Sequence, residues 1–376
     1  MMKKRYFTDY LMLDQKICSI NNSLETNVLS YINPQNVDLE KQKFFEALKK
    51  GDIYNPRFNY APRNPIYSYF AISPSFDTYR RELKELVNEC EHDSLGLIFE
   101  RRMLDLFEKM DLMRSAGTEN FTNNSEEYYG KVTKNLLSFA TELVKKKVPH
   151  EKKTMSLETA KKKIYVELKK RGLPHKIIPR KTSGSSYSVQ VTKRELYINE
   201  DEKFSDEEIK RLIAHEIEAH VYRYENGLLQ PYKMFAQGIS KENTETEEGL
   251  AVKIEELKGV SVAAQLKDYA GRVIAVHSAT RKDFYHTFLD LKKYFNDEDS
   301  FRLALRAKRG TSRTDKKGAF TKDILYLRGK IAVETFLLDY KLEDLYMGRY
   351  SIYDYPLVRD IDGLKKPKYL PSFLKK

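Results

Sequence analysis

Cysteine is scarce in this chain of 376 residues, and long apolar runs are missing. The two cysteines, Cys18 and Cys90, lie far apart and outside any Cys-x-x-Cys spacing, so neither a disulfide framework nor a thiolate zinc site is supported. No run approaches the roughly 18 apolar residues that a membrane span needs. Asp9 and Asp14 interrupt the stretch where a signal peptide would be apolar. We therefore expect a cytoplasmic protein with reduced thiols and no membrane partner.

Positive charge is in excess, with a formal net charge of +12 that should attract acidic partners. Apolar residues make up 41% of the chain, which is enough for a sizeable core in one large domain or two smaller ones. No Cys/His finger or RNA-binding aromatic signature accompanies the basic residues, so nucleic acid is not the expected partner. The lysine clusters fit solvated faces and a loose C-terminus: 145–147, 161–163, 169–171 and 365–376.

The chain is predicted to be α+β and mostly helical, with three regions that form one integrated domain. Residues 1–150 read as a helical N-terminal region, 151–350 as a catalytic region and 351–376 as a C-terminal tail. Apolar residues at helical spacing from Ser94 to Met113 predict a core helix. A stretch rich in proline and tyrosine, Asn55 to Pro65, interrupts the helical pattern.

A short sheet is predicted in the second region. Ser156 is a plausible N-cap for a helix that stops at Arg171-Gly172. Ser186 to Val191 and Glu195 to Asn199 then alternate in the manner of strands and should pair as a hairpin around Thr192 to Arg194. The sheet should therefore directly precede the next helix.

Three later helices carry start signals. Ser205 and Glu208 form a predicted capping box for a helix that runs to about Tyr224 and stops at Asn226-Gly227. A second capping box, Thr244 to Glu247, predicts a helix that ends at Lys258-Gly259. Thr321 is the expected cap of a third helix.

The Ser205 helix contains His215-Glu216-x-x-x-His220, two potential zinc ligands with a glutamate that could take a proton from metal-bound water. Residues five apart diverge by about 140° on an ideal α-helix, against about 40° for the familiar four-residue spacing. We therefore predict a π-bulge, in which bonding from residue i to i+5 stacks the two histidines. Two of seven histidines could also share a helix by chance, with Glu216 and His220 as a surface pair.

A third ligand is expected from the next helix. A zinc site of two histidines and one glutamate leaves a fourth coordination position for water. By spacing, either Glu247 or Glu248 could be the third protein ligand. The predicted capping box occupies Glu247, which makes Glu248 the freer ligand. Gly249 beside it would let another backbone approach closely.

Several motifs resemble the microtubule-associated tyrosine carboxypeptidase family and its bacterial relatives, labelled flavohaemoglobin expression-modulating QEGLP-motif proteins. The resemblance covers about residues 50 to 345, and the single glutamate of the bacterial motif aligns with Glu248, although this chain has Ala251 where that motif has proline. The matching residues are His215-Glu216-x-x-x-His220, Arg223, Asn226-Gly227, Thr246-x-Glu248-Gly249-Leu250-Ala251, Asn55 to Phe58, Ser186 to Val191, Arg309-Gly310, Phe320 to Asp323 and Tyr326 to Gly329.

The resemblance implies a mostly helical, zincin-like metallopeptidase with one zinc ion per chain, a small sheet beside the HExxxH helix, and removal of a C-terminal tyrosine from a protein tail. Glu216 is then the general base. Arg223 and Tyr326 are candidate oxyanion donors, although Arg223 could instead pair with Glu225 or Glu218 and Tyr326 could be a core residue. A terminal carboxylate needs a cation, for which Lys322 and Arg328 are preferred ahead of Arg309, with solvated helix charges as the alternative.

The expected substrate is a peptide or protein tail, which an acidic sequence would suit because the field of the chain is positive. The strand at Ser186 to Val191 could receive such a tail by strand addition, or could simply complete its own sheet. The first alternative function is a zinc-binding adaptor that has lost catalysis, against which Glu216 argues. The second is a basic nucleic-acid-binding protein with an incidental HExxxH.

Overall fold

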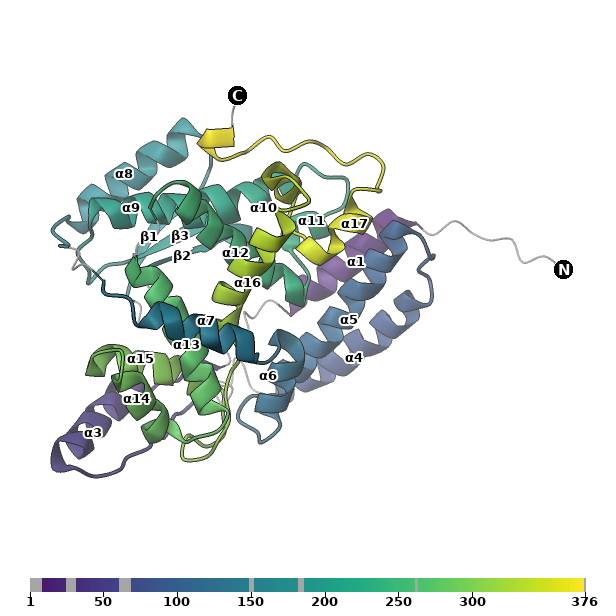
Figure 1. Cartoon of the computed structure of the whole chain (residues 1–376). Coiled ribbons are helices and arrows are strands. Elements are labelled where there is room, and N and C mark those ends of the chain that lie inside the picture. Colours follow the sequence, from purple (N-terminus) through teal and green to yellow (C-terminus); the bar gives the residue numbers. More distant parts are fainter. Residues whose placement is uncertain are drawn as a thin grey trace.

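The computed structural model describes residues 9–24, 32–60, 69–148, 152–181, 186–260 and 263–374, and in them helices predominate. Figure 1 shows three helices packed together on one side of the molecule: α1 (Tyr10–Ser23), α4 (Tyr69–Val87) and α5 (Ser94–Ser115). The small sheet and α8 (Leu157–Lys170) lie on the opposite side, and α12 (Lys241–Leu257) and α16 (Leu325–Phe336) lie between the two groups. The centre of the molecule therefore carries α12, on which the predicted site depends.

The N-terminal region is helical, as predicted. Helix α5 covers the predicted Ser94–Met113 core helix, and its apolar face is buried, including Phe99 and Met103. Residues 55–60 are irregular, apart from an isolated bridge from Tyr60 to Pro34, and 61–65 lie outside the described residues. The described residues of this region also form α3 (Val37–Lys50), α6 (Phe121–Tyr129) and α7 (Lys134–Val144), and α7 packs on a helix of the second region, α13 (Ala263–Ala279).

The sheet has three strands in the order β1-β3-β2. The predicted hairpin is confirmed, because β2 (Tyr187–Gln190) pairs antiparallel with β3 (Glu195–Asn199) through a short 3-10 turn. Strand β1 (Lys176–Arg180) pairs parallel with β3 and was not predicted, since its sequence, KIIPR, has no alternation and contains a proline. Ser156 caps α8 as expected.

The HExxxH helix is continuous but changes its hydrogen bonding midway. It begins as α9 (Asp206–Leu212) with the predicted Ser205–Glu208 capping box, continues as a π-helix, η4 (Ile213–Val221), and ends as α10 (Tyr222–Gly227). The predicted wide turn is therefore present, and it spans both histidines.

Helix α12 begins one turn earlier than predicted. Ser240 is its N-cap and accepts hydrogen bonds from the backbone amides of Glu242 and Asn243, so the predicted capping box at Thr244 to Glu247 is wrong. Thr321 is not a side-chain cap either, because its hydroxyl donates to the carbonyl of Ser125. It precedes a short 3-10 turn, η5 (Lys322–Ile324), that leads into α16.

The segment predicted as a loose tail is packed against the rest of the chain. The Asn226 side chain accepts from the backbone amides of Lys368 and Tyr369 and donates to the carbonyl of Tyr369. The other elements of the second half are α11 (Met234–Gln237), α14 (Phe284–Lys292), α15 (Asp297–Lys308), η6 (Leu342–Tyr346), η7 (Ile352–Asp354), α17 (Tyr355–Val358) and η8 (Ser372–Leu374).

Helices α12 and α16 cross at a pair of glycines. A Cβ added at Gly249 would lie 2.2 Å from the backbone of Gly329, which confirms the close approach predicted at Gly249. We expect Gly249→Ala to lower the free energy of unfolding by about 1–3 kcal/mol, because the added methyl group forces the helices apart. Urea unfolding measures the change, and Glu256→Ala on the exposed face of α12 is the control. Equal stability of the two variants would show that the crossing is looser than described.

Candidate metal centre

The π-helix stacks the two histidines on one face. The rings of His215 and His220 have centroids 5.0 Å apart and planes at 80° to each other, with His215 buried and His220 partly buried. A π-helix with bonding from i to i+5 brings residues five apart into line, whereas an α-helix would turn them away from each other. The local change of helix type thus creates the pair of imidazoles.

A carboxylate holds the Nδ1 atom of each imidazole. His215 Nδ1 lies 2.7 Å from Glu255 Oε1, and His220 Nδ1 lies 2.8 Å from Glu247 Oε2. A carboxylate at one ring nitrogen fixes the orientation and tautomer of the ring and makes the other nitrogen a better metal ligand. The arrangement therefore leaves Nε2 of both rings as the potential ligand atoms.

Glu248 completes the cluster. One ligand atom each from His215, His220 and Glu248 lies within 4.8 Å of the others, and His215 Nε2 is 3.6 Å from Glu248 Oε2. Burial opposes ionisation of Glu248, but the two histidines and Lys322 outweigh it and lower the pKa of this carboxyl to about 2. Ligand atoms on a tetrahedral zinc lie roughly 3.3–3.6 Å apart, so the donor set of two imidazoles and one carboxylate fits zinc.

The other candidate ligand, Glu247, faces a different group. Its carboxylate accepts from Arg223 at 2.5 Å and from Arg349 at 3.3 Å, in addition to its contact with His220. The sequence-based reason for preferring Glu248 was a capping role for Glu247, and that role is absent. Glu247 is instead outside the cluster, because its carboxylate contacts Nδ1 of His220 and not the side of the ring that carries Nε2.

The extra residue of the wide turn, Glu218, is buried and neutralised. Its carboxylate accepts from Arg171 at 2.8 Å and from Lys258 at 2.7 Å, and its backbone carbonyl accepts from the Tyr346 hydroxyl at 2.9 Å. A π-turn leaves part of the regular helical bonding unfilled, and such orphan carbonyls need other partners. These contacts hold the bulge in place.

Glu216 lies beside the cluster and the edge of the sheet. It is buried, and burial raises its pKa against the opposing effect of His215, His220 and the backbone amide of Val189. The bond from Asn199 N to Ser186 O sets the alternation of the ladder, so Tyr187 and Val189 direct their amide and carbonyl groups away from β3. Within the described residues, β2 has no strand on that side.

Arg223 lies in a different position from the one predicted. Its side chain is fully buried, and its nitrogens donate to Glu247 and to the carbonyls of residues 345, 348 and 350. These partners occupy the guanidinium, so the structure does not bring Arg223 to a substrate. The predicted pairing alternatives are also not formed, since Glu218 pairs with Arg171 and Glu225 with Arg194.

The four other predicted substrate residues fall into two groups. Lys322 and Tyr326 are partly buried and interact electrostatically with Glu248, which places both near the cluster. Tyr326 also stacks on Tyr269, with ring centroids 5.0 Å apart. Arg328 points to Glu245 at 2.6 Å, and Arg309 packs over Phe320 and donates to Asn33, so both have partners inside the protein.

Sequence reasoning missed Glu255, which supports His215. The signal was available, because Glu248 and Glu255 are seven residues apart and therefore lie on one face of α12. The cluster as a whole draws its groups from only two elements, the π-helix and α12.

These elements define a mostly helical α+β protein with a partly buried cluster of two imidazoles and a carboxylate. A family model described as microtubule-associated tyrosine carboxypeptidase matches residues 42–376, and the chain belongs to this family. Microtubule-associated tyrosine carboxypeptidase 1 is 24% identical in Rattus norvegicus over 357 residues and 25% identical in Mus musculus over 358 residues. Each alignment covers 93% of this chain and 65% of the relative, so the chain spans about two thirds of their length. Among the described helices, none is long and apolar enough to cross a membrane.

Proposed function

We propose that the protein is a zinc-dependent carboxypeptidase that removes one residue from the C-terminus of a protein or peptide tail. The observation that carries the proposal is the convergence of His215, His220 and Glu248 within 4.8 Å, with the Nδ1 atom of both imidazoles held by carboxylates. Such support of ligands by a second layer of carboxylates is typical of zinc sites in enzymes. The names of the relatives, which are tyrosine carboxypeptidases, point to the same activity.

Each residue around the cluster has a distinct part in the proposed reaction. A zinc ion bound there would supply Lewis acidity for the attacking water and the scissile carbonyl. Glu216 takes the proton from the water and passes it to the leaving amine, a role that suits a buried carboxylate with a raised pKa. Tyr326 is the candidate hydrogen-bond donor to the oxyanion, and Lys322 is the candidate partner of the terminal carboxylate.

The substrate would be an extended tail. The outward amide and carbonyl groups of Tyr187 and the carbonyl of Val189 could pair with its backbone, while the Val189 amide bonds to Glu216; this is recognition by strand addition. The net charge of +12 favours an acidic tail. The relatives are named as microtubule-associated, which makes the tyrosine-ended tail of tubulin the first substrate to test.

We expect the protein, purified without added metal, to contain about one zinc ion per chain. His220→Ala should reduce zinc affinity at least about 10-fold, because even the loss of a supporting residue typically costs 10–100-fold. Elemental analysis and chelator competition measure both quantities. His286→Ala, which changes an exposed histidine outside the cluster, should retain full zinc affinity. Absence of zinc in the parent protein would contradict the metal centre.

Incubation with peptides of varied C-termini, followed by mass spectrometry, tests the activity itself. Loss of one C-terminal residue from free-acid peptides, with amidated peptides left intact, is the expected result because Lys322 is available to a carboxylate. A protein that holds zinc but leaves every peptide intact would instead match the alternative function, a zinc-binding adaptor without catalysis.

A further inference from the structure

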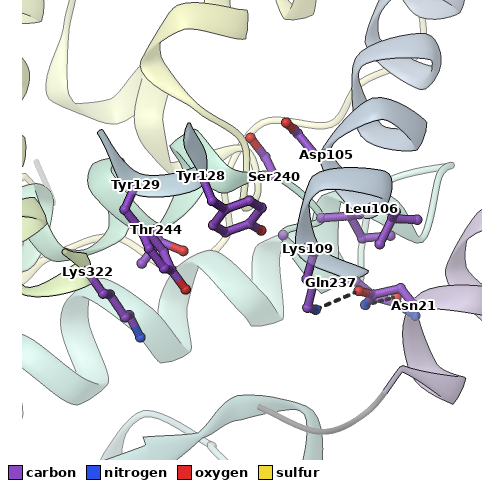
Figure 2. Close-up of a pocket in the computed structure, with 12 residues that line it drawn as sticks. Asn21, Asp105, Leu106, Lys109, Tyr128, Tyr129, Gln237, Ser240, Thr244 and Lys322 are labelled. Atoms are coloured by element: carbon purple, nitrogen blue, oxygen red, sulfur yellow. Dashed lines mark hydrogen bonds between the residues drawn. The ribbon is translucent and has the colours of Figure 1, made fainter. Parts of the chain in front are cut away.

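A small cavity lies next to the cluster, between the N-terminal helices and α12. Its walls come from α1, α5, α6, the segment before α12, α12 itself and η5, and Figure 2 shows the side chains that line it. Its volume is about 170 Å³, below the roughly 300–1,000 Å³ of typical small-molecule sites. The cavity is therefore of a size for one amino-acid side chain rather than for a cofactor.

The cavity adjoins the metal centre at one end. Thr244 lines it and precedes Glu248 by four residues on α12, so the two share a face of the helix one turn apart. Lys322 also lines the cavity and interacts electrostatically with Glu248. A residue that enters from the metal centre would therefore pass Lys322 first.

A second lysine, Lys109, lies at the other end of the cavity. Figure 2 shows Lys109 well separated from Lys322, with the side chains of Tyr128 and Tyr129 between them. Burial and the positive charge of Lys322 lower the pKa of Lys109 to about 8. Its amine donates to Asn21 Oδ1 at 3.3 Å, and within the described ranges no carboxylate forms an ion pair with it.

The far end of the cavity is lined by polar side chains. Asn21 is itself bound to Gln237 at 3.0 Å, and the two amides and Lys109 form a small cluster of hydrogen-bonding groups. Asp105 also lines the cavity, and its carboxylate accepts from Arg102 at 3.1 Å. This end therefore suits a polar tip such as a hydroxyl, which can accept a hydrogen bond from Lys109.

Resting on the proposed carboxypeptidase function, we propose that this cavity receives the side chain of the residue to be removed and that Lys109 determines specificity by donating a hydrogen bond to the phenolic oxygen of a terminal tyrosine. The backbone carboxylate then stays at Lys322, beside the metal centre, while the ring lies against Tyr128 and Tyr129, which pack edge to face on each other and line the cavity. A buried polar group built for a hydroxyl discriminates strongly against a ligand without one, because it is left unpaired. Phenylalanine would fill the same space but leave Lys109 with a donor that the phenolic oxygen would have filled, beyond its bond to Asn21.

The test measures binding to Glu216→Gln holoenzyme, which avoids turnover. Two fluorescent peptides that differ only in a C-terminal tyrosine or phenylalanine are titrated by anisotropy. We expect the tyrosine peptide to bind about 10-fold tighter or more, and the ratio to fall to near one when Lys109→Met is added. Lys241→Met is the matched control, because this lysine is close in space but pairs with Glu108 outside the cavity, and it should keep the ratio.

Several outcomes would overturn the inference. The inference is wrong if the ratio of the two affinities is unchanged in Lys109→Met, or if that variant loses affinity equally for both peptides. It is also wrong if the parent binds a glutamate-ended peptide more tightly than the tyrosine peptide. If Lys109→Met folds poorly, Lys109→Arg takes its place in the test. Because arginine retains a donor, this variant should keep part of the preference for the tyrosine peptide. If the parent protein lacks zinc or cleaves no peptide, the proposed function fails instead, whereas the binding ratio still reports on Lys109 alone.

Discussion

Glu216→Gln is expected to lower kcat/KM by about 10²–10⁴-fold on a tail peptide while the protein keeps its zinc. The amide has nearly the shape of the carboxylate but cannot accept the proton of the attacking water. Because Glu216 is buried beside His215 and His220 without being one of the three converging ligand groups, its loss should leave metal affinity close to that of the parent. Steady-state kinetics and elemental analysis on the same preparation measure both effects.

Glu256→Gln is the matched control for this prediction. Glu256 lies on α12 near the supporting residue Glu255, but it points outward and pairs with Lys253 and Lys330. Its amide variant should cleave at the parental rate. If Glu216→Gln also cleaves at that rate, the assignment of the general base is wrong even in a zinc-containing protein.

Glu247→Ala is expected to lower the free energy of unfolding by about 3–5 kcal/mol. Arg223 is fully buried, and Glu247 is the carboxylate that forms an ion pair with it, so the variant leaves an uncompensated charge inside the protein. Urea unfolding measures the loss. Glu207→Ala, which breaks an exposed pair with Lys210, should change stability by no more than about 0.5 kcal/mol.

The loss caused by Glu247→Ala should also depend on pH. Burial opposes ionisation of Glu247, but Arg223, Arg349 and His220 outweigh it and hold its pKa far below the ordinary value of 4.5. A carboxyl with a lowered pKa contributes stability that is present above its unfolded pKa and is lost as the pH falls towards its folded pKa. The difference between parent and variant should therefore be constant above pH 4.5 and shrink in stronger acid. A difference that grows in acid would contradict the pairing.

Local signals predicted the secondary structure well where they depend on neighbours in the chain. The Ser205–Glu208 capping box, the Ser156 cap and the β2–β3 hairpin all form as expected, because each is made by residues a few positions apart. The start of α12 was misplaced because local signals alone do not distinguish two candidate caps. Ser240 and Thr244 are both acceptable caps, and only packing around Asn243 and Glu247 decides between them.

The spacing of the two histidines predicts the type of helix but not the residues that stabilise it. Two histidines five positions apart cannot easily meet at one metal ion on an α-helix, so the π-helix could be predicted from the spacing alone. The partners that stabilise it could not, because Arg171, Lys258 and Tyr346 come from distant parts of the chain. The same holds for Arg223, whose partners include three backbone carbonyls that no pattern reveals.

The amino-acid sequence by itself determined the helical character, the π-turn and the two converging histidines, since these follow from caps, periodicity and the spacing of His215 and His220. Spacing left Glu247 and Glu248 open, and the tertiary structure decided for Glu248. Only the tertiary structure decided which neighbours serve the cluster. It assigned Glu247 and Glu255 to the histidines, buried Arg223, and brought Lys109 from α5 to the same cavity as Lys322. The physical reason is that ion pairs and cavities depend on distances between elements, which are set by how helices pack and not by their sequence separation.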